Sequence, residues 1–283
     1  MHNRFEDIEM PRIVLENTTE LRRKKIMKSV LTPLMIESIN GALDSGQQVI
    51  LFRNRRVFAP MLECKQCGWV PKCKHCDVSL TYHRYHHQLK CHYCNSSYKV
   101  VEECPVCKTN SVEQLGMGTE MLEQEVANLF PNAVIERMDT DTTRGKNSYE
   151  RIINDFQEGR TDILVGTQML SKGLDFDNVS LVGIIAADGL LNHPNFRSHE
   201  RGFQLMMQSA GRAGRKGQQG RVVIQAADPE ISLFKYLQAN DYVSFYYMQL
   251  NERKLFNYPP YTRLISIVLK HRDGGVVDSG AHF

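Results

Sequence analysis

The sequence predicts an α/β fold in which helices flank a parallel β-sheet, and a small cysteine-rich segment interrupts that pattern. Short apolar runs of the kind that form buried parallel strands occur at residues 49–52, 163–165, 179–186 and 221–224. Amphipathic helical segments lie between them, at residues 120–130, 148–156 and 198–210. This alternation is typical of a parallel sheet with helices on both faces.

The composition is that of a globular protein. A chain of 283 residues with 42% hydrophobic content can bury a core and form about two compact units. The net charge of +3 permits an anionic partner without demonstrating one. No run approaches the roughly 18 apolar residues of a membrane span, and residues 1–10 lack the apolar core of a signal peptide. We therefore expect a cytoplasmic protein with no membrane partner.

The first elements are a linker and a helix. Residues 1–30 combine a Pro-containing extended stretch with a basic run at 22–25, which is typical of a linker that enters from an N-terminal half. Thr32 and Pro33 then supply a helix cap and a favourable first position, and Gly46 supplies a stop. The spacing predicts a helix over 33–44.

The remaining boundaries follow from the cysteine segment. Residues 63–111 are expected to be an insertion, and residues 31–62 and 112–257 are expected to form the lobe that it interrupts. The sequence Tyr-Pro-Pro-Tyr at 258–261 precedes an apolar run at 264–269, which reads as a strand. Residues 258–283 are therefore expected to begin a truncated C-terminal domain.

The eight cysteines form four Cys-x-x-Cys pairs, and this pattern predicts two structural zinc ions. Each pair can offer two thiolates, and two pairs complete a closed tetrahedral site. The 14 residues between Cys76 and Cys91 are close to zinc-ribbon spacing, which favours nested pairing over sequential pairing. The first zinc would then take Cys64, Cys67, Cys104 and Cys107, and the second Cys73, Cys76, Cys91 and Cys94.

Disulfides or redox-active pairs are the alternatives to metal. Lysines beside the pairs would offset the formal charge of about −2 on each four-thiolate site, which favours metal.

Two later segments carry motifs. Residues 163–176 (ILVGTQMLSKGLDF) pass from a buried strand into a polar loop interrupted by glycine. Residues 208–215 (QSAGRAGR) place Arg212 and Arg215 three positions apart, on one face of a helical turn. These segments resemble motifs V and VI of superfamily 2 helicases. Over about residues 30–270 the chain resembles the second half of the bacterial primosomal replication-restart DNA helicases, in which an eight-cysteine domain interrupts this lobe at this place.

The resemblance implies a RecA-like second motor lobe with an inserted zinc-ribbon-like domain. The whole enzyme would be an ATP-dependent 3′ to 5′ DNA helicase that restarts stalled replication forks and loads the primosome. Its cofactors would be two structural Zn²⁺ ions, with ATP and Mg²⁺. Its partners would be single-stranded and forked DNA, the single-stranded-DNA-binding protein and other primosome proteins.

The resemblance also implies roles on the nucleotide side. Arg212 and Arg215 would stabilise charge on the γ-phosphate, because a guanidinium is a rigid donor that keeps its proton. Gln208 would orient these arginines or the attacking water, and Gly173 and Asp175 would line the nucleotide. We expect the two arginines to face the edge of the sheet that binds ligands.

A second group of residues is a candidate for DNA binding. Thr167 and Gln168 follow a predicted strand at its carboxyl end, where open α/β sheets bind ligands, and Lys172 adds a charge. Further candidates for the same track are Arg53, Arg55 and Arg56, for which simple solvation is the alternative. Leu174 stands where the family commonly has a polar residue, so no role is carried over to it.

Half of an ATP site is missing from the sequence. The chain has neither a Gly-x-x-x-x-Gly-Lys-Ser/Thr loop nor an Asp-Glu-x-His segment, so we expect the chain alone not to hydrolyse ATP. Two other functions remain open: another superfamily 2 DNA translocase, and a non-enzymatic zinc module that binds DNA or protein. The eight-cysteine insertion argues against the first, and a test for DNA-dependent ATPase activity with a phosphate-binding lobe attached would separate these alternatives.

Overall fold

The computed structural model describes most of the chain. The described residues are 10–53, 61–76, 78–83, 87–91, 93–114, 119–139, 142–143, 145, 147–171, 176–192, 195–214, 219–265, 269 and 274–281. They divide into two compact units, residues 1–245 and 246–283.

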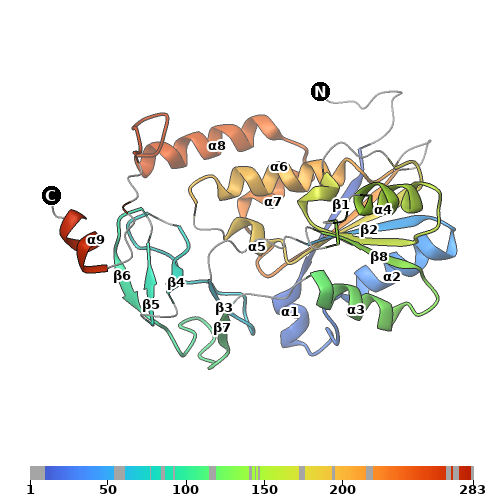
Figure 1. Cartoon of the computed structure of the whole chain (residues 1–283), viewed down its shortest axis with the longest axis horizontal. Helices are drawn as coiled ribbons and strands as arrows, with labels where there is room; N and C mark the ends of the chain where they lie inside the picture. Colours follow the sequence, from blue (N-terminus) through green and yellow to red (C-terminus); the bar gives the residue numbers. More distant parts are fainter. Residues whose placement is uncertain are drawn as a thin grey trace. The chain divides into compact units, whose positions relative to one another are not determined.

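A parallel sheet forms the centre of the first unit (Figure 1). Within the described residues it has six strands in the order β1-β11-β10-β2-β9-β8. Their bounds are β1 (Arg12–Asn17), β11 (Arg221–Ala226), β10 (Val179–Ile185), β2 (Gln48–Arg53), β9 (Ile163–Gly166) and β8 (Ile135–Met138). All neighbouring pairs are parallel, so the carboxyl ends of all six strands lie along one edge of the sheet.

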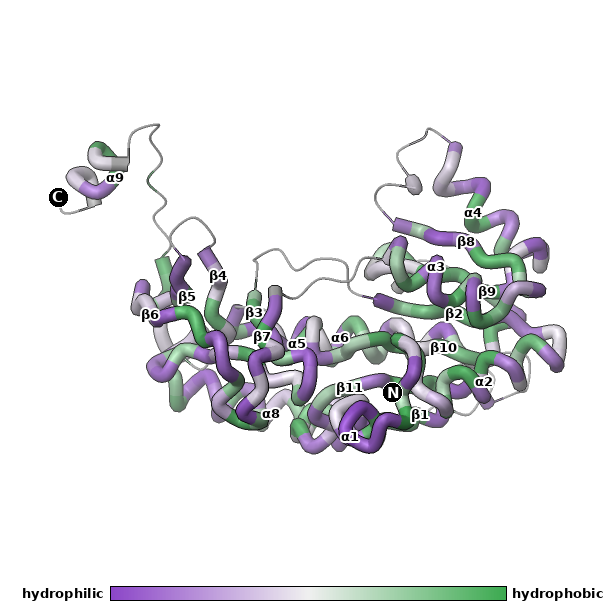
Figure 2. The backbone as a smooth tube through the Cα atoms, turned by 90° about the horizontal axis from the view of Figure 1, so that it is seen from below, coloured by the Kyte–Doolittle hydropathy of each residue, from purple (hydrophilic) through white to green (hydrophobic). Residues whose placement is uncertain are grey.

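Helices cover both faces of this sheet. Figure 1 shows α2 (Pro33–Asp44) and α3 (Thr119–Leu129) on one side, with α4 (Ser148–Gln157), α6 (Ser198–Ala210) and α7 (Ser232–Gln238) on the other. Alternate strand residues point to opposite faces, so Val49 and Leu51 pack with α2 and α3 in one core cluster. Ile50 and Phe52 are as deeply buried on the other face. The inner strands β9 and β10 are accordingly mostly hydrophobic (Figure 2), with Ser180 as a polar residue in β10.

The predicted helix over 33–44 is confirmed as α2. Thr32 caps it by accepting a hydrogen bond from the backbone N–H of Met35, and Pro33 occupies its first turn. The chain leaves the helix through Gly46, whose φ of +66° is a conformation that favours glycine.

The expectation of a linker over residues 1–30 is corrected for the described part of that segment. Arg12–Asn17 forms β1, which pairs with β11, and α1 (Thr18–Arg23) follows it directly. The side chain of Asn17 caps α1 by accepting from the N–H of Glu20. The sheet register, rather than local apolar content, makes this segment part of the lobe.

The loops at the carboxyl edge contain two short helical segments. The 3₁₀ helix η2 (Gln168–Ser171) follows β9, and α5 (Asp188–Leu191) follows β10. Beyond α5 the chain enters α6, which returns along the sheet toward β11.

The cysteine-rich insertion begins and ends on a two-stranded stem. Strands β3 (Leu62–Cys64) and β7 (Val112–Gln114) pair antiparallel, so the chain enters and leaves the insertion side by side. Between them, β4 (Thr81–His83), β5 (Gln88–Lys90) and β6 (Ser97–Lys99) form a three-stranded antiparallel sheet. A small core that includes Leu80, Leu89 and the thiol of Cys91 packs against that sheet.

The second unit begins earlier than residue 258. Helix α8 (Tyr242–Leu255) passes from one unit into the other. Its last turns hold the Tyr-Pro-Pro segment, because Tyr258 N–H donates to the carbonyl of Arg253 and the Arg253 guanidinium donates to the carbonyl of Pro259. The strand expected at 264–269 is absent from Leu264, Ile265 and Leu269, its described residues, and α9 (Gly274–Ala281) follows.

No helix among the described residues combines the length and the apolar character needed to cross a membrane.

Candidate functional site

The eight thiols gather in two groups of four. One group contains Cys64, Cys67, Cys104 and Cys107, and the other contains Cys73, Cys76, Cys91 and Cys94. Within each group the four sulfur atoms lie within 4.8 Å of one another. This is the nested grouping that the spacing predicts, because the β4–β5 hairpin carries the outer pairs toward each other.

The spacing of the sulfur atoms fits a tetrahedral zinc. With Zn–S bonds of about 2.3 Å, tetrahedral thiolates lie about 3.8 Å apart. The Sγ atoms of Cys64 and Cys107 are 3.5 Å apart, and those of Cys73 and Cys94 are also 3.5 Å apart. No disulfide links any of the eight. Four thiols and no open position make each group suited to a structural ion rather than a catalytic one.

Hydroxyl groups surround the thiols and favour their charged form. The Thr109 hydroxyl lies 3.1 Å from Cys107 Sγ, and the Ser96 hydroxyl lies 3.1 Å from Cys94 Sγ. These hydrogen bonds lower the pKa of each of the two thiols to about 6. Burial raises the pKa of Cys67, so a cation is needed to keep all four thiols of its group deprotonated.

The first cysteine pair docks on the carboxyl edge of the lobe. The Thr19 hydroxyl, in α1, donates to the carbonyl of Cys67 at 3.2 Å. Gly68 adopts φ +74°, and a Cβ atom there would lie 2.3 Å from the Cβ of Ala227, just past β11. Only glycine permits this close approach.

Those predicted DNA-binding residues that the structure describes lie at the carboxyl edge of the sheet. Thr167 is buried directly after β9, and Gln168 begins η2. Lys172, Arg55 and Arg56 lie outside the described residues.

Arg53, at the end of β2, is partly buried near Glu63. Burial lowers the pKa of Arg53, and the nearby Glu63 carboxylate opposes that shift. Burial likewise raises the pKa of Glu63. Arg53 therefore joins the strand end to the insertion and presents little surface to a ligand.

The segment at 208–215 lies at the amino edge of the sheet where it is described. This corrects the expectation that Arg212 faces the carboxyl edge, where such sheets bind ligands. Gln208 is exposed on the last turn of α6, and Arg212 follows that helix. The N–H of Gly214 donates to the carbonyl of Val179, the first residue of β10, so this turn sits at the amino ends of the strands. Because α6 runs opposite to the strands, it carries Arg212 away from the carboxyl edge. Arg215, Gly173 and Asp175 lie outside the described residues.

A buried carboxylate that sequence reasoning left without a role holds the end of β8. Asp139 Oδ2 accepts hydrogen bonds from the Thr119 hydroxyl at 2.6 Å and from Arg137 at 3.0 Å. Its Oδ1 accepts from the N–H of Thr142. The Asp-Thr-Asp-Thr-Thr sequence at 139–143 was the available signal, and its Asp139 ties the end of β8 to the start of α3.

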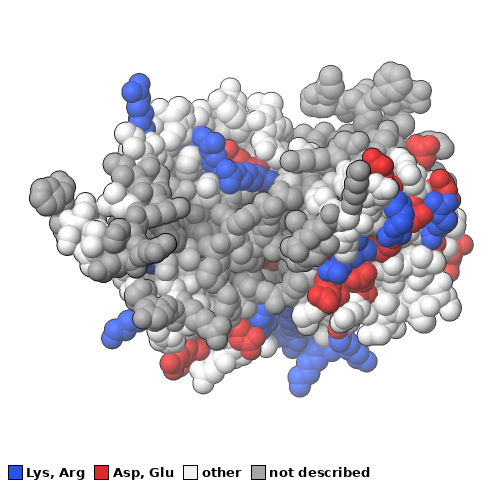
Figure 3. Space-filling model, in the orientation of Figure 1, with Lys and Arg blue, Asp and Glu red and all other residues white. Residues whose placement is uncertain are grey.

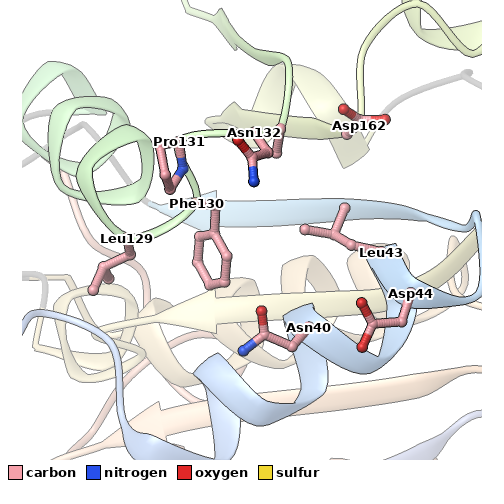
Figure 4. A pocket seen from close by; sticks show the side chains of 9 residues that line it. Asn40, Leu43, Asp44, Leu129, Phe130, Pro131, Asn132 and Asp162 are labelled. Atoms are coloured by element: carbon pink, nitrogen blue, oxygen red, sulfur yellow. The ribbon is translucent and has the colours of Figure 1, made fainter.

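A cavity of about 340 Å³ opens between the ends of α2 and α3 (Figure 4). None of the predicted site residues lines it. Asp44 and Asp162 do, and two carboxylates disfavour a phosphate-bearing ligand. We therefore assign it no part in nucleotide binding.

Acidic and basic side chains are mixed over part of the surface, and basic side chains predominate near α1. On the face drawn in Figure 3, acidic and basic side chains intermingle over α3 and α4, where Arg151 pairs with Glu136 and Asp155. Basic side chains gather near α1, whose last turn and following residues expose a run of cations at 22–25.

Two family models match the chain. Residues 99–217 match the helicase conserved C-terminal domain, and residues 73–99 match the Cys-rich region domain of the PriA DNA helicase.

Curated relatives match over most of the chain. It is 40% identical over 264 residues to the replication restart protein PriA of Bacillus subtilis (strain 168), covering 93% of this chain and 33% of that protein. It is 40% identical over 256 residues to PriA of Haemophilus influenzae, covering 90% of this chain and 35% of that protein. The chain thus spans about a third of the length of these relatives.

A solved structure of S. cerevisiae Dbp5, bound to RNA and ADP BeF3, aligns with 87% of this chain and 45% of that chain. The sequence identity is 12% and the TM-score is 0.39. The assignment of the fold therefore rests on the sheet itself and on the family models.

Proposed function

The chain is homologous to a segment of the PriA replication restart proteins, and from this premise we propose that it supplies the second motor lobe of an ATP-dependent DNA helicase. The whole protein would use that helicase to restart stalled replication forks and to load the primosome.

The observation that carries this proposal is the joint occurrence of two features at one place. A parallel sheet, part of which lies in the match to the helicase C-terminal domain, is interrupted between β2 and α3 by an insertion with two four-cysteine groups. A general translocase needs no such insertion, and a free-standing zinc module needs no six-stranded parallel sheet with motifs V and VI.

On the nucleotide side, Arg212 and Arg215 stabilise the charge that develops on the γ-phosphate. Guanidinium groups suit this task because they stay protonated and offer several donors in a fixed plane. Gln208, exposed one turn before Arg212, orients these donors or the attacking water. Gly173 and Asp175 line the same side.

ATP and Mg²⁺ are held by a lobe that carries the phosphate loop, because this chain has no such loop. Mg²⁺ bound there would supply positive charge that offsets the charge of the phosphates. The contribution of this chain is to place its arginines across the cleft from that lobe.

On the DNA side, backbone and hydroxyl donors at the carboxyl edge hold phosphates of single-stranded DNA. Thr167 and Gln168 supply such donors at the end of β9, and Lys172 adds a positive charge. Arg55 and Arg56 continue this track, while the partly buried Arg53 lies at the strand end from which they follow.

The two edges of the sheet thus have different partners. The strands connect the proposed DNA side, at their carboxyl ends, with the proposed nucleotide side, at the amino end of β10. A rotation of the lobe about bound nucleotide therefore moves its DNA contacts, as translocation along DNA requires.

The zinc ions have a structural role in this proposal. Each closed four-thiolate site holds two Cys-x-x-Cys turns together and offers no position for a substrate. The proposed partners are forked DNA, the single-stranded-DNA-binding protein and other primosome proteins. The proposed location is the cytoplasm, because a bacterial chromosome lies there.

The test compares the 283-residue chain with a full-length protein that carries a phosphate-binding lobe. We expect single-stranded DNA to stimulate ATP hydrolysis in the full-length protein, and we expect no turnover from the chain alone. DNA-stimulated hydrolysis by the chain alone, or none by the full-length protein, would contradict the proposal.

A further inference from the structure

The second group of four thiols touches the lobe at the start of α6. Tyr93 lies between Cys91 and Cys94, in the turn that holds two of the ligands. Its hydroxyl accepts a hydrogen bond of 3.2 Å from the backbone N–H of Phe196. The two residues are 103 positions apart in the sequence, so the contact joins the insertion to a distant part of the lobe.

Ring packing reinforces this hydrogen bond. The rings of Tyr93 and Phe196 meet edge to face, with centroids 6.3 Å apart and an angle of 75° between their planes. The guanidinium of Arg197 lies over the Phe196 ring, 5.2 Å from its centroid. On its other side Tyr93 packs against the core of the insertion. The side chain is therefore held from both domains.

The position of Phe196 gives the contact its importance. Asn195 accepts hydrogen bonds from the N–H groups of Arg197 and Ser198, which places Phe196 in the turn that opens α6. Helix α6 has 13 residues, so it extends about 20 Å from this turn. Its far end carries Gln208, and Arg212 follows. One end of α6 is thus attached to a zinc turn, and the other bears the nucleotide-facing motif.

The helix between these ends is firmly packed and can transmit a displacement. Phe203 and Met206 are buried in its middle, and the ring of Phe203 stacks on that of Phe245 with centroids 4.2 Å apart. A rigid helix moves as a unit, so a shift at Phe196 alters the position of Arg212.

We propose that Tyr93 is a positioning residue that couples the second zinc group to the nucleotide-facing end of α6. DNA held at the carboxyl edge, where the insertion docks, changes the placement of Arg212 through this contact. The inference rests on the proposed function, because it assigns Tyr93 a role in how DNA stimulates ATP hydrolysis.

The variant Tyr93→Phe tests this directly, because it removes only the acceptor oxygen and keeps the ring and all eight thiols. Tyr82→Phe is the matched control. Tyr82, in β4 of the same insertion, loses the same hydroxyl, but that hydroxyl pairs with His87 inside the insertion, 3.1 Å away. Zinc content should stay at two ions per chain in both variants, which shows that each insertion is folded.

The first measurement is hydrogen–deuterium exchange on the 283-residue chain. The Phe196 N–H loses its acceptor in Tyr93→Phe, so exchange at Phe196 and in the first turn of α6 should quicken relative to wild type. In Tyr82→Phe it should not. Equal exchange in the two variants would show that the contact does not hold α6.

The second measurement is steady-state ATP hydrolysis by the full-length protein with and without single-stranded DNA. In Tyr93→Phe the DNA-stimulated kcat should fall by about tenfold, while the KM for ATP and the DNA-free rate change by less than about twofold. Tyr82→Phe should match wild type. A normal DNA-stimulated kcat with quickened exchange, or an equal fall in the DNA-free rate, would overturn the proposal. Absence of ATPase activity from the wild type would contradict the proposed function instead, and the exchange measurement would still judge the contact.

Discussion

At the scale of single residues, Asp188 shows how burial shapes the carboxyl edge of the sheet. Its Oδ2 accepts a 2.7 Å hydrogen bond from the N–H of Ala227, which joins the end of β10 to the end of β11. The carboxyl is almost fully buried, and desolvation raises its pKa despite the backbone donors around it. The residue therefore couples protonation to the stability of the lobe.

We expect the destabilisation caused by Asp188→Asn to be larger at about pH 5 than at about pH 8. A carboxyl with a raised pKa in the folded state contributes stability that is present below its unfolded pKa and is lost as pH rises through its folded pKa. Urea unfolding of both proteins at the two pH values measures this, with the exposed Glu37→Gln as control. If the loss of unfolding free energy caused by Asp188→Asn were the same at both pH values, or larger at about pH 8, the raised pKa of Asp188 would be contradicted.

Arg215 is the residue on which the catalytic proposal depends most. In the full-length protein, Arg215→Ala should lower the ATP turnover number by a factor on the order of 10³, with a smaller effect on nucleotide affinity. The reason is that the guanidinium acts on charge that develops in the transition state. Initial-rate kinetics and nucleotide binding separate the two effects, and a near-normal rate would remove Arg215 from the catalytic group.

At the scale of elements, the insertion and the parallel sheet are stabilised by different means. The insertion has a small core built around its cysteines, whereas the sheet buries apolar side chains on both faces. Metal binding in such a small domain supplies much of its folding free energy.

Removal of zinc by a chelator should therefore unfold residues 64–107 and leave the sheet folded. Hydrogen exchange resolved by segment measures this: amides of β4 and β5 should lose protection, while those of β2 and β9 should keep theirs. Loss of protection throughout the sheet would show that the lobe depends on the metal, and fewer than two zinc ions per folded chain would contradict the two sites.

The docking of the first cysteine pair can be tested with two glycines of similar backbone conformation. Gly68 and Gly46 have φ of +74° and +66°, so alanine brings comparable backbone strain at both, on the order of 1 kcal/mol. Only at Gly68 does the new Cβ meet a neighbour, Ala227, at 2.3 Å. Gly68→Ala should therefore cost about 1–3 kcal/mol more than Gly46→Ala in chemical denaturation. Equal costs would mean that the insertion does not press against β11.

At the scale of the whole molecule, the sequence predicted the centre of the lobe better than its margins. The inner strands β2, β9 and β10 are largely buried on both faces, so each is mainly apolar, and Ser180 is a polar residue within β10. The edge strands β1 and β8 are only partly buried and carry charged residues such as Arg12 and Glu136. Their membership depends on hydrogen bonding to a neighbour, which no local pattern reveals.

The candidate site divides in the same way. The grouping of the eight thiols follows from short spacings and one hairpin, which are local properties. The place of Arg212 depends on the direction in which α6 runs, so its motif alone suggested the wrong edge of the sheet. The Tyr93–Phe196 contact joins two segments that have no pattern in common, and only the assembled fold shows it.

The stem of β3 and β7 has a consequence for how such a lobe can change over evolutionary time. Because Leu62 lies opposite Gln114, the departing and returning chain are neighbours. A gene segment that encodes everything between them could be gained, lost or exchanged for a short turn without altering the path of the surrounding polypeptide. The metal-binding part can therefore diversify while the helicase lobe around it retains its architecture.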